Sequence, residues 1–224
     1  MNIEELALRR GIIDSCKAMN ASGINQGTSG NISARYGDTL LITPSGVPYE
    51  ELAPEDIAAM PIQGEYGSWT GPMRPSSEWR FHLDIIRARP EVGAVVHAHS
   101  TYCTTLAICG REIPALHYMI AATGADRIPC APYATYGTQE TADNAVKALK
   151  GRNACLLANH GMIVVGPNLK KAMWLAVEVE TLAAQYWRAL QVGKPRILSK
   201  AEIDRVIDKF KTYGQAKEPA PACC

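Results

Sequence analysis

The chain has 224 residues, of which 47% are hydrophobic, and it carries 23 Lys and Arg against 22 Asp and Glu. This length is enough to bury a hydrophobic core and predicts one domain. A net charge of +1 argues against a nucleic-acid partner, which needs a strongly basic face. No apolar run approaches the ~20 residues that a membrane-spanning helix requires, so no membrane partner is expected.

In the first half of the chain, short strand patterns alternate with helix patterns. Apolar residues recur at helical spacing over 3–22, before Gly23, and over 78–88, before Pro90. Strands are predicted over 31–35, 39–43, 57–62 and 94–99, and a short helix over 101–108. The loops between these elements are rich in Gly, Ser, Asn and Pro, above all over 63–75.

The second half continues the alternation. Strands are predicted over 127–131, 154–158 and 162–165, and helices over 138–150, 168–191 and from Ser199 to about 211. Ser199 and Glu202 form the capping-box pattern that opens the last helix. The class is therefore α/β in one domain over 1–215. Helices do not separate the strands regularly, which favours a mixed sheet over a doubly wound parallel one.

The cysteines and the two ends of the chain bear on the compartment. The seven cysteines are scattered and form no C-x-x-C pair, which favours reduced, buried thiols. The acidic start lacks the charged and apolar pattern of a signal peptide, so a cytoplasmic location is expected. Residues 216–224, rich in Pro and Ala and ending in Cys223-Cys224, show no periodicity and are predicted to be a flexible tail.

Three histidines are candidate metal ligands. His97 and His99 stand at i and i+2 of a predicted strand, so both side chains point to the same face. His160 follows another apolar strand, and three imidazoles with an open position suit a catalytic zinc ion. The alternative is that all three are hydrogen-bonded core histidines, because spacing alone does not show that they converge. Packing or a helix-face contact is the expected role of His82, and His117 is expected to pack in the core, with a supporting role near the metal ligands as the alternative.

Small residues with hydroxyl or amide donors cluster in three segments, which are Gly27-Thr28-Ser29-Gly30-Asn31, Thr43-Pro44-Ser45-Gly46 and Ser76-Ser77-Glu78. Glycine-rich loops expose backbone N–H groups to an anion, and a helix N-terminus adds a favourable dipole. Together the segments predict a phosphate pocket with little net charge, although each alone is also typical of a turn or a helix start. Glu78 is stabilised by the helix dipole in any case, and near a metal it is a candidate general base.

These motifs occur in one order and spacing, and as a set they resemble the class II aldolase/adducin family. Further stretches resemble the branch of that family that cleaves L-fuculose 1-phosphate. They are residues 76–82, 113–122, 128–137 and 209–214. The resemblance extends from about Leu6 to Gly214.

The resemblance implies a single three-layer α/β/α domain with a central, mainly antiparallel sheet, assembled as a homotetramer with active sites between subunits. It implies Zn²⁺ on His97, His99 and His160, with Glu78 as acid/base and as a further ligand when substrate is absent. It assigns substrate phosphate to Thr28, Gly30, Asn31, Thr43, Ser45, Gly46, Ser76 and Ser77. It places Tyr118 of an adjacent subunit and the C-terminal Tyr213 beside the site.

The implied reaction cleaves a ketose 1-phosphate to dihydroxyacetone phosphate and a short aldehyde such as L-lactaldehyde. A metal acting as a Lewis acid removes the need for a Schiff-base lysine. The alternative substrates are 5-deoxyribulose 1-phosphate and 5-(methylthio)ribulose 1-phosphate, which the metal and phosphate motifs do not distinguish. A sugar-phosphate 4-epimerase and a non-catalytic adducin-like scaffold fit the motifs less well.

Overall fold

The structure is a computed structural model that describes residues 1–212. Its elements are α1 (Ile3–Ala21), β1 (Asn31–Tyr36), β2 (Thr39–Ile42), η1 (Pro54–Asp56), β3 (Ala58–Pro61), α2 (Trp79–Ala88), β4 (Ala94–Ala98), α3 (Thr101–Ile108), η2 (Tyr118–Thr123), β5 (Cys130–Ala131), α4 (Gln139–Ala148), β6 (Ala154–Leu157), β7 (Gly161–Gly166), α5 (Leu169–Val192) and α6 (Lys200–Phe210). The predicted tail over 216–224 and Tyr213 lie outside the described residues.

The strands form one seven-stranded sheet in the order β3-β2-β1-β4-β7-β6-β5. Every neighbouring pair is antiparallel except β5 and β6, which are parallel. This arrangement confirms the mixed, mainly antiparallel sheet. The central strand β4 lies between β1 and β7, and its residue His97 is opposite Asn31 on one side and Ile163 on the other.

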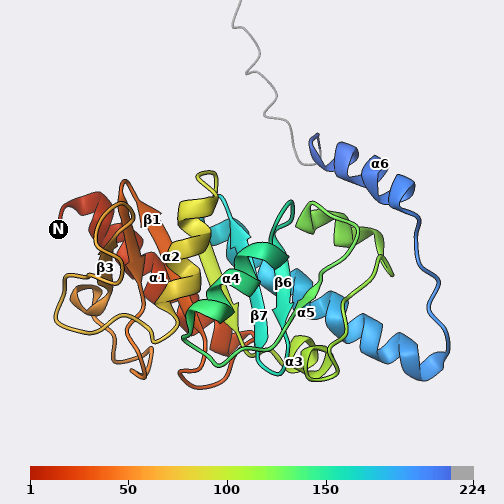
Figure 1. The fold of residues 1–224 in the computed structure, drawn as a ribbon, viewed down its shortest axis with the longest axis horizontal. Helices are drawn as coiled ribbons and strands as arrows, with labels where there is room; N and C mark the ends of the chain where they lie inside the picture. The colour runs from red at the N-terminus through yellow and green to blue at the C-terminus, as the bar shows by residue number, and fades with distance from the viewer. Residues whose placement is uncertain (213–224) are drawn as a thin grey trace, which may run out of the picture.

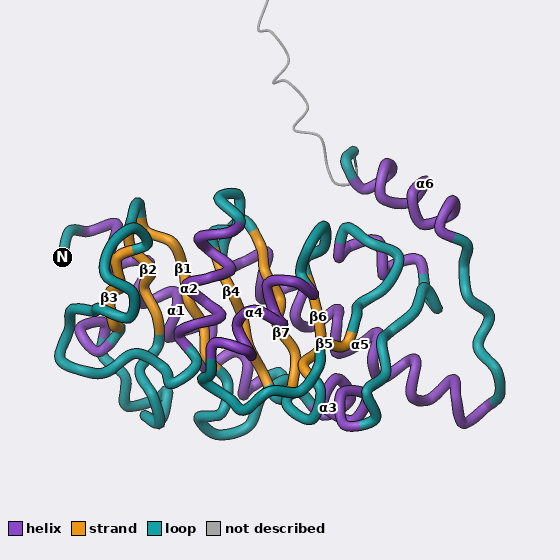
Figure 2. The backbone as a smooth tube through the Cα atoms, viewed as in Figure 1, coloured by secondary structure: helices purple, strands orange, loops and turns teal. Residues whose placement is uncertain are grey.

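Helices cover both faces of the sheet, which gives three layers (Figure 1). Along β4 the side chains alternate between the faces, as the pleat of a strand requires. Val95 packs with the apolar side chains of α2 and α4, whereas Val96 packs with those of α1, α3 and α5. Figure 2 shows the strands running between these two helix layers. Because both faces are buried, the strands read as nearly continuous apolar runs.

Local signals place most element boundaries within a few residues of the prediction. The side chain of Asn168 accepts a hydrogen bond from the backbone N–H of Lys171 at the start of α5. Ser199 likewise accepts from the N–H of Glu202 and begins α6 as expected. Gly23, with φ of 73°, follows the end of α1 in a conformation that favours glycine. Over residues 1–212, no helix is both long and apolar enough to cross a membrane.

Two segments differ from the prediction. The strand expected over 127–131 is shortened to β5, because Ile128 instead pairs with Ile113 in an isolated bridge. The helix η2 was not predicted, because its six residues are too few to show a helical period. It packs against α6, where the ring centroids of Tyr118 and Phe210 lie 6.5 Å apart.

Candidate metal and substrate site

Four predicted residues from three separate parts of the chain meet at one end of the sheet. His97 lies on β4, His99 just beyond its end, and His160 in the turn between β6 and β7. Glu78 is the N-cap residue of α2, which packs across the same face as His97. The order of the sheet brings them together, because β7 pairs directly with β4 and begins beside its carboxyl end, next to the turn that carries His160.

The donor atoms of these residues point at a common centre. His97 Nε2 lies 3.0 Å from His99 Nε2 and 3.2 Å from Glu78 Oε2. His160 Nε2 lies 3.1 Å from Glu78 Oε1. One ligand atom from each residue lies within 4.8 Å of all the others. The three imidazole rings meet edge to face, with centroids 4.8 to 4.9 Å apart.

The hydrogen bond of His97 leaves a lone pair facing the centre of the site. His97 donates from Nδ1 to the carbonyl oxygen of Met162 at 2.9 Å, so its Nε2 carries no proton in the neutral ring. Burial and the neighbouring imidazoles lower the pKa of His99 to about 4, which keeps that ring neutral. Burial alone would raise the pKa of Glu78, but its contacts with His97 and His160 outweigh this effect and hold the pKa well below its usual range.

These features fit a bound metal cation. Four ligands at about 2.0–2.1 Å from a tetrahedral zinc ion would have atoms roughly 3.3 Å apart, close to the measured spacings. Glu78 Oε1 is buried and has no hydrogen-bond partner among the described residues, so a cation would satisfy it. His97 Nε2 and His99 Nε2, 3.0 Å apart, both face the same centre as the Glu78 carboxylate, so a cation there would be held by both rings. The backbone carbonyl bonded to His97 is the kind of outer partner that orients a metal-binding imidazole.

Two unusual backbone positions hold the turn that carries His160. Asn159 has φ of 56°, a left-handed conformation that Asn tolerates better than most residues. A Cβ at Gly161 would lie 2.6 Å from the carbonyl oxygen of Ala98 and 3.0 Å from Cδ2 of His99. Only glycine therefore allows β7 to approach the end of β4 closely enough to bring His160 beside His99.

A cavity of about 410 Å³ opens above the cluster. Its lining includes seven residues predicted for the site, which are Thr28, Ser45, Gly46, Ser77, Glu78, His99 and His160. Ser29, Tyr133, Ala134, Tyr136 and Asn159 complete the lining. The phosphate-type loops and the metal-type cluster thus share one cavity.

Sequence reasoning assigned no role to Tyr133 and Tyr136. Both are more than half exposed at the cavity mouth, at 59% and 65%. Their segment, residues 128–137, contributed to the family resemblance, but nothing in its local pattern indicated where the rings point. The only signal in the sequence was a pair of aromatic residues in a short loop-like segment that follows two prolines and ends at a glycine, where aromatic side chains are often exposed.

The other predicted phosphate ligands lie behind the cavity wall. Asn31, Thr43 and Ser76 are buried. Ser76 Oγ accepts from the N–H of Glu78 at 3.2 Å, and Thr43 Oγ1 accepts from the N–H of Ile32 at 3.3 Å. Gly30, the fourth predicted phosphate ligand outside the cavity lining, packs tightly against β4. A Cβ added to it would lie 2.9 Å from the carbonyl oxygen of His97.

Tyr118 lies elsewhere in the chain, half-exposed on η2. It lines a second cavity of about 750 Å³ between η2, α5 and α6, together with Trp174 and Phe210. Within one chain it therefore does not line the cavity of Glu78. Tyr213 lies beyond the described residues.

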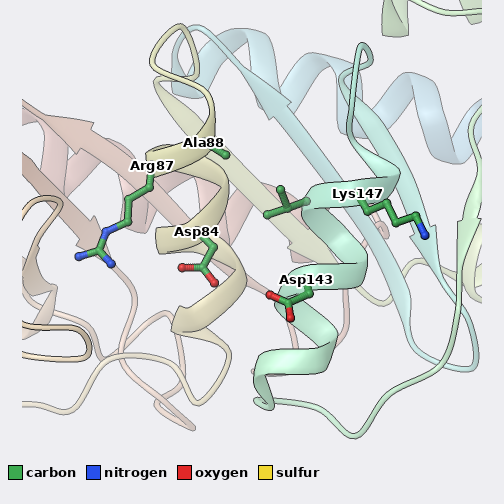
Figure 3. Close-up of a pocket in the computed structure, with 6 residues that line it drawn as sticks. Asp84, Arg87, Ala88, Asp143 and Lys147 are labelled. Carbon is green, nitrogen blue, oxygen red and sulfur yellow. The ribbon is translucent and has the colours of Figure 1, made fainter.

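A third hollow, between α2 and α4, contains none of the predicted site residues (Figure 3). Asp84 and Asp143 face it from the two helices. Gln139 donates to both carboxylates, at 2.7 and 3.0 Å, so these acids are already partnered. The histidine cluster is the one group of potential metal ligands found in the described part of the chain.

Comparisons with known proteins agree with this geometry. A family profile described as "Class II Aldolase and Adducin N-terminal domain" matches residues 10–187. The 5-methylthioribulose-1-phosphate/5-deoxyribulose-1-phosphate aldolase of Rhodospirillum rubrum is 54% identical over 96% of this chain and 97% of its own length. The L-fuculose phosphate aldolase of Escherichia coli is 50% identical, over 95% and 98%. A solved structure of an L-fuculose 1-phosphate aldolase superposes with a TM-score of 0.88 at 39% identity, over 92% of this chain and 96% of that one.

Proposed function

Because this chain belongs to the class II aldolase and adducin family and is a class II aldolase, we propose that it cleaves a ketose 1-phosphate of the L-fuculose 1-phosphate type with the help of Zn²⁺. The products are dihydroxyacetone phosphate and a short aldehyde such as L-lactaldehyde. The observation that carries the proposal is the buried cluster of three imidazoles and one carboxylate, on the floor of a cavity lined by hydroxyl groups and a glycine loop.

The phosphate group of the substrate binds at the mouth of this cavity. Thr28, Ser45 and Ser77 offer hydroxyl donors there, and Gly46, with φ of 73°, turns the backbone so that N–H groups can face an anion. Ser77 also immediately precedes Glu78, the N-cap residue of α2, where the helix dipole favours negative charge. Asn31, Thr43, Ser76 and Gly30 support these loops from behind.

His97, His99 and His160 hold the metal, with Glu78 as a fourth ligand when no substrate is bound. A bound Zn²⁺ supplies Lewis-acid stabilisation of the negative charge that develops on the substrate oxygens during carbon–carbon cleavage. Nε2 of His97 is suited to this role because Nδ1 of the same ring donates to the carbonyl oxygen of Met162 and leaves the Nε2 lone pair facing the centre.

Glu78 carries a proton to and from the three-carbon fragment. When the bond between the third and fourth carbons of the ketose breaks, its electron pair stays with the phosphorylated fragment, the hydroxyl oxygen on the fourth carbon becomes the aldehyde oxygen, and its proton passes to the carboxylate of Glu78. The fragment then accepts a proton from Glu78 at the carbon that was cleaved. The carboxylate is ionised before the reaction, and its position against the histidines places it over the same centre.

Tyr118 belongs to this mechanism only if a second copy of the chain supplies it. We therefore include in the proposal a homotetramer with active sites between subunits, in which Tyr118 of a neighbour and Tyr213 act on the aldehyde side. The exposure of Tyr118 and Trp174, at 49% and 45%, supports an interface at this part of the surface. Residues 1–215 form the catalytic domain in this proposal, and the free thiols of the described cysteines fit a cytoplasmic location.

A second candidate substrate is 5-deoxyribulose 1-phosphate or 5-(methylthio)ribulose 1-phosphate. The relative from Rhodospirillum rubrum, whose name contains both compounds, has 54% identity with this chain, against 50% for the fuculose phosphate aldolase of Escherichia coli. Both candidate classes would leave the same phosphorylated fragment in the pocket. They differ in the aldehyde, because L-lactaldehyde carries a hydroxyl group that acetaldehyde and its methylthio derivative lack.

The experiment is a substrate panel assayed with zinc-loaded protein. L-fuculose 1-phosphate, 5-deoxyribulose 1-phosphate and 5-(methylthio)ribulose 1-phosphate are each supplied, and the release of dihydroxyacetone phosphate is followed with a coupled dehydrogenase. We expect the highest kcat/KM with L-fuculose 1-phosphate. A preference for either of the other two would select the second candidate, and no release from any of the three at full zinc occupancy would reject the aldolase assignment of the site.

A further inference from the structure

His82 is a fully buried histidine to which the proposed reaction gives no role. It lies on α2, four residues after Glu78, and its ring stacks on that of Phe81 with centroids 4.6 Å apart. A hydrophobic residue of similar size would pack equally well at this place. The polar atoms of the ring, however, are both engaged in hydrogen bonds, which indicates a more specific role.

The bonds of His82 form a chain that ends at Glu78. Ser33 Oγ lies 2.7 Å from His82 Nδ1, and His82 Nε2 lies 2.5 Å from Asn31 Oδ1. Asn31 then donates from Nδ2 to Glu78 Oε2 at 3.0 Å. All four side chains are buried, so water does not compete with these bonds.

Because the ionised carboxylate of Glu78 only accepts, Asn31 turns its amide nitrogen toward it, and this fixes one direction for the whole chain of bonds. Asn31 Oδ1 is an acceptor, so His82 Nε2 must carry the proton, and His82 Nδ1 must then accept from the hydroxyl of Ser33. Burial and the nearby His97 lower the pKa of His82 to about 3, which keeps the ring neutral and preserves this pattern. Each group therefore donates toward Glu78, and the last donor is the amide N–H of Asn31.

The orientation of the Asn31 amide decides what Glu78 meets. With Nδ2 toward the carboxylate, the contact is a hydrogen bond, whereas a flipped amide would place Oδ1 against Oε2 and repel it. Nothing in the shape of an amide prevents the flip, because its oxygen and nitrogen are nearly equal in size. The N–H of His82 opposes it, since a flipped amide would present another donor to that N–H unless the ring moved its proton to Nδ1 and reversed its bond with Ser33.

We propose that His82 is a positioning residue for proton transfer by Glu78, acting through the side-chain amide of Asn31. With its amide nitrogen toward Glu78, Asn31 donates a hydrogen bond to Oε2 of that carboxylate. Oε1 of Glu78 then remains turned toward His160 and the cavity. The inference rests on the proposed function, because it concerns the same carboxylate. It adds a residue that touches neither substrate nor metal ligands and that works through one intermediate side chain.

The readout that isolates this step is proton exchange in the three-carbon product alone. Without any aldehyde, Glu78 removes a proton from the hydroxymethyl carbon of dihydroxyacetone phosphate, and the C–H electron pair moves into the fragment. Return of a solvent deuteron to the same carbon regenerates the molecule with one deuterium. The exchange rate, followed by proton NMR in heavy water, reports the action of the carboxylate without carbon–carbon cleavage.

Three substitutions at His82 separate hydrogen bonding from packing. His82→Gln places an amide N–H near the position of Nε2 and keeps the donor toward Asn31, whereas His82→Asn is one methylene shorter and loses it. His82→Leu removes both polar atoms. We expect an exchange rate within about threefold of wild type for the Gln variant, and a loss of about 10- to 100-fold for the Asn and Leu variants, as for a misplaced catalytic group. The KM for dihydroxyacetone phosphate and the zinc content should stay within twofold.

Leu83→Ala is the matched structural control. Leu83 is the next residue on α2, is fully buried among apolar side chains, and takes no part in the chain of hydrogen bonds. Its substitution should lower the melting temperature and leave the exchange rate per folded molecule unchanged. Equal losses of exchange in Leu83→Ala and His82→Leu would show that any disturbance of α2 suffices, and would overturn the proposal. If His82→Leu does not fold, the contrast between the Gln and Asn variants decides, and equal rates in those two would also overturn it.

A double-mutant cycle tests whether the effect passes through Glu78. In a Glu78→Gln background, adding His82→Asn should cause no further loss of the residual exchange, because the group being positioned is absent. A further loss as large as in the wild-type background would refute the proposed route. Absence of exchange and of cleavage in the zinc-loaded wild type would instead reject the proposed function, so the two failures are distinguishable.

Discussion

Replacing Glu78 by Gln is the sharpest test of the proposed chemistry, because the structure shows that the new side chain fits. Glu78 Oε2 accepts from Asn31 at 3.0 Å, and Oε1 faces His160 Nε2 at 3.1 Å. A glutamine can keep its oxygen toward Asn31 and place its amide nitrogen where Oε1 stands beside His160. Shape and one hydrogen bond are preserved, and the loss is confined to the charge and the proton-carrying capacity of the carboxylate.

The expected size follows from the role of the group. A positioned general acid or base contributes about 10²- to 10⁴-fold to the rate, which corresponds to about 3–5 kcal/mol in the activation free energy. We therefore expect kcat of Glu78→Gln to fall by at least about 100-fold, while three imidazoles still bind zinc stoichiometrically. Turnover is measured as release of dihydroxyacetone phosphate, metal content by atomic absorption, and folding by the melting temperature.

The matched control is Glu91→Gln, which removes the same charge from an exposed carboxylate on the loop before β4. This variant should retain wild-type turnover. If Glu78→Gln holds a full equivalent of zinc and turns over within threefold of wild type, the proton-transfer role of Glu78 is refuted. If it loses zinc as well, a structural role for Glu78 in holding the metal would have to replace the catalytic one.

Three further predictions concern the metal and its supports. His97→Ala should lose bound zinc and turnover together, and a stoichiometric zinc content after dialysis would contradict the ligand assignment. Gly161→Ala would place a Cβ 2.6 Å from the carbonyl oxygen of Ala98, so β7 must shift, and zinc affinity measured by competition with a chelator should fall by about 10- to 100-fold. Tyr49→Phe removes the hydroxyl that donates to the carbonyl oxygen of Gly30 at 2.6 Å, and should lower the free energy of unfolding in urea by about 1–3 kcal/mol; an unchanged midpoint would refute this.

Much of the secondary structure could be predicted because the signals are local. Asn168 and Ser199 begin α5 and α6 by accepting hydrogen bonds from backbone N–H groups only three residues away. The α/β class and the mixed sheet follow from the same alternation of short strands and helices. The segment from 111 to 131 was less predictable, because η2 is short and the pairing of Ile113 with Ile128 depends on how the chain folds back.

Part of the candidate site could also be predicted from local sequence pattern, and part could not. The two-residue period of a strand puts His97 and His99 on one face. The local pattern likewise predicts that Ser77 and Glu78 lie at a helix N-terminus. The family resemblance added the expectation that these residues and His160 act together. Residue spacing alone left open whether they converge or pack separately in the core.

The sequence by itself determined which segments become strands and helices, and which residue types are available for metal and phosphate chemistry. Only the tertiary structure decided that Glu78 and His160 face His97 and His99, and that Asn31 turns toward Glu78 and His82 behind the cavity. It also decided that Tyr133 and Tyr136, rather than Tyr118 of the same chain, line that cavity. The physical reason is that helix caps and strand periods depend on neighbours a few residues away, whereas convergence depends on the order β1-β4-β7, a set of pairings between distant segments.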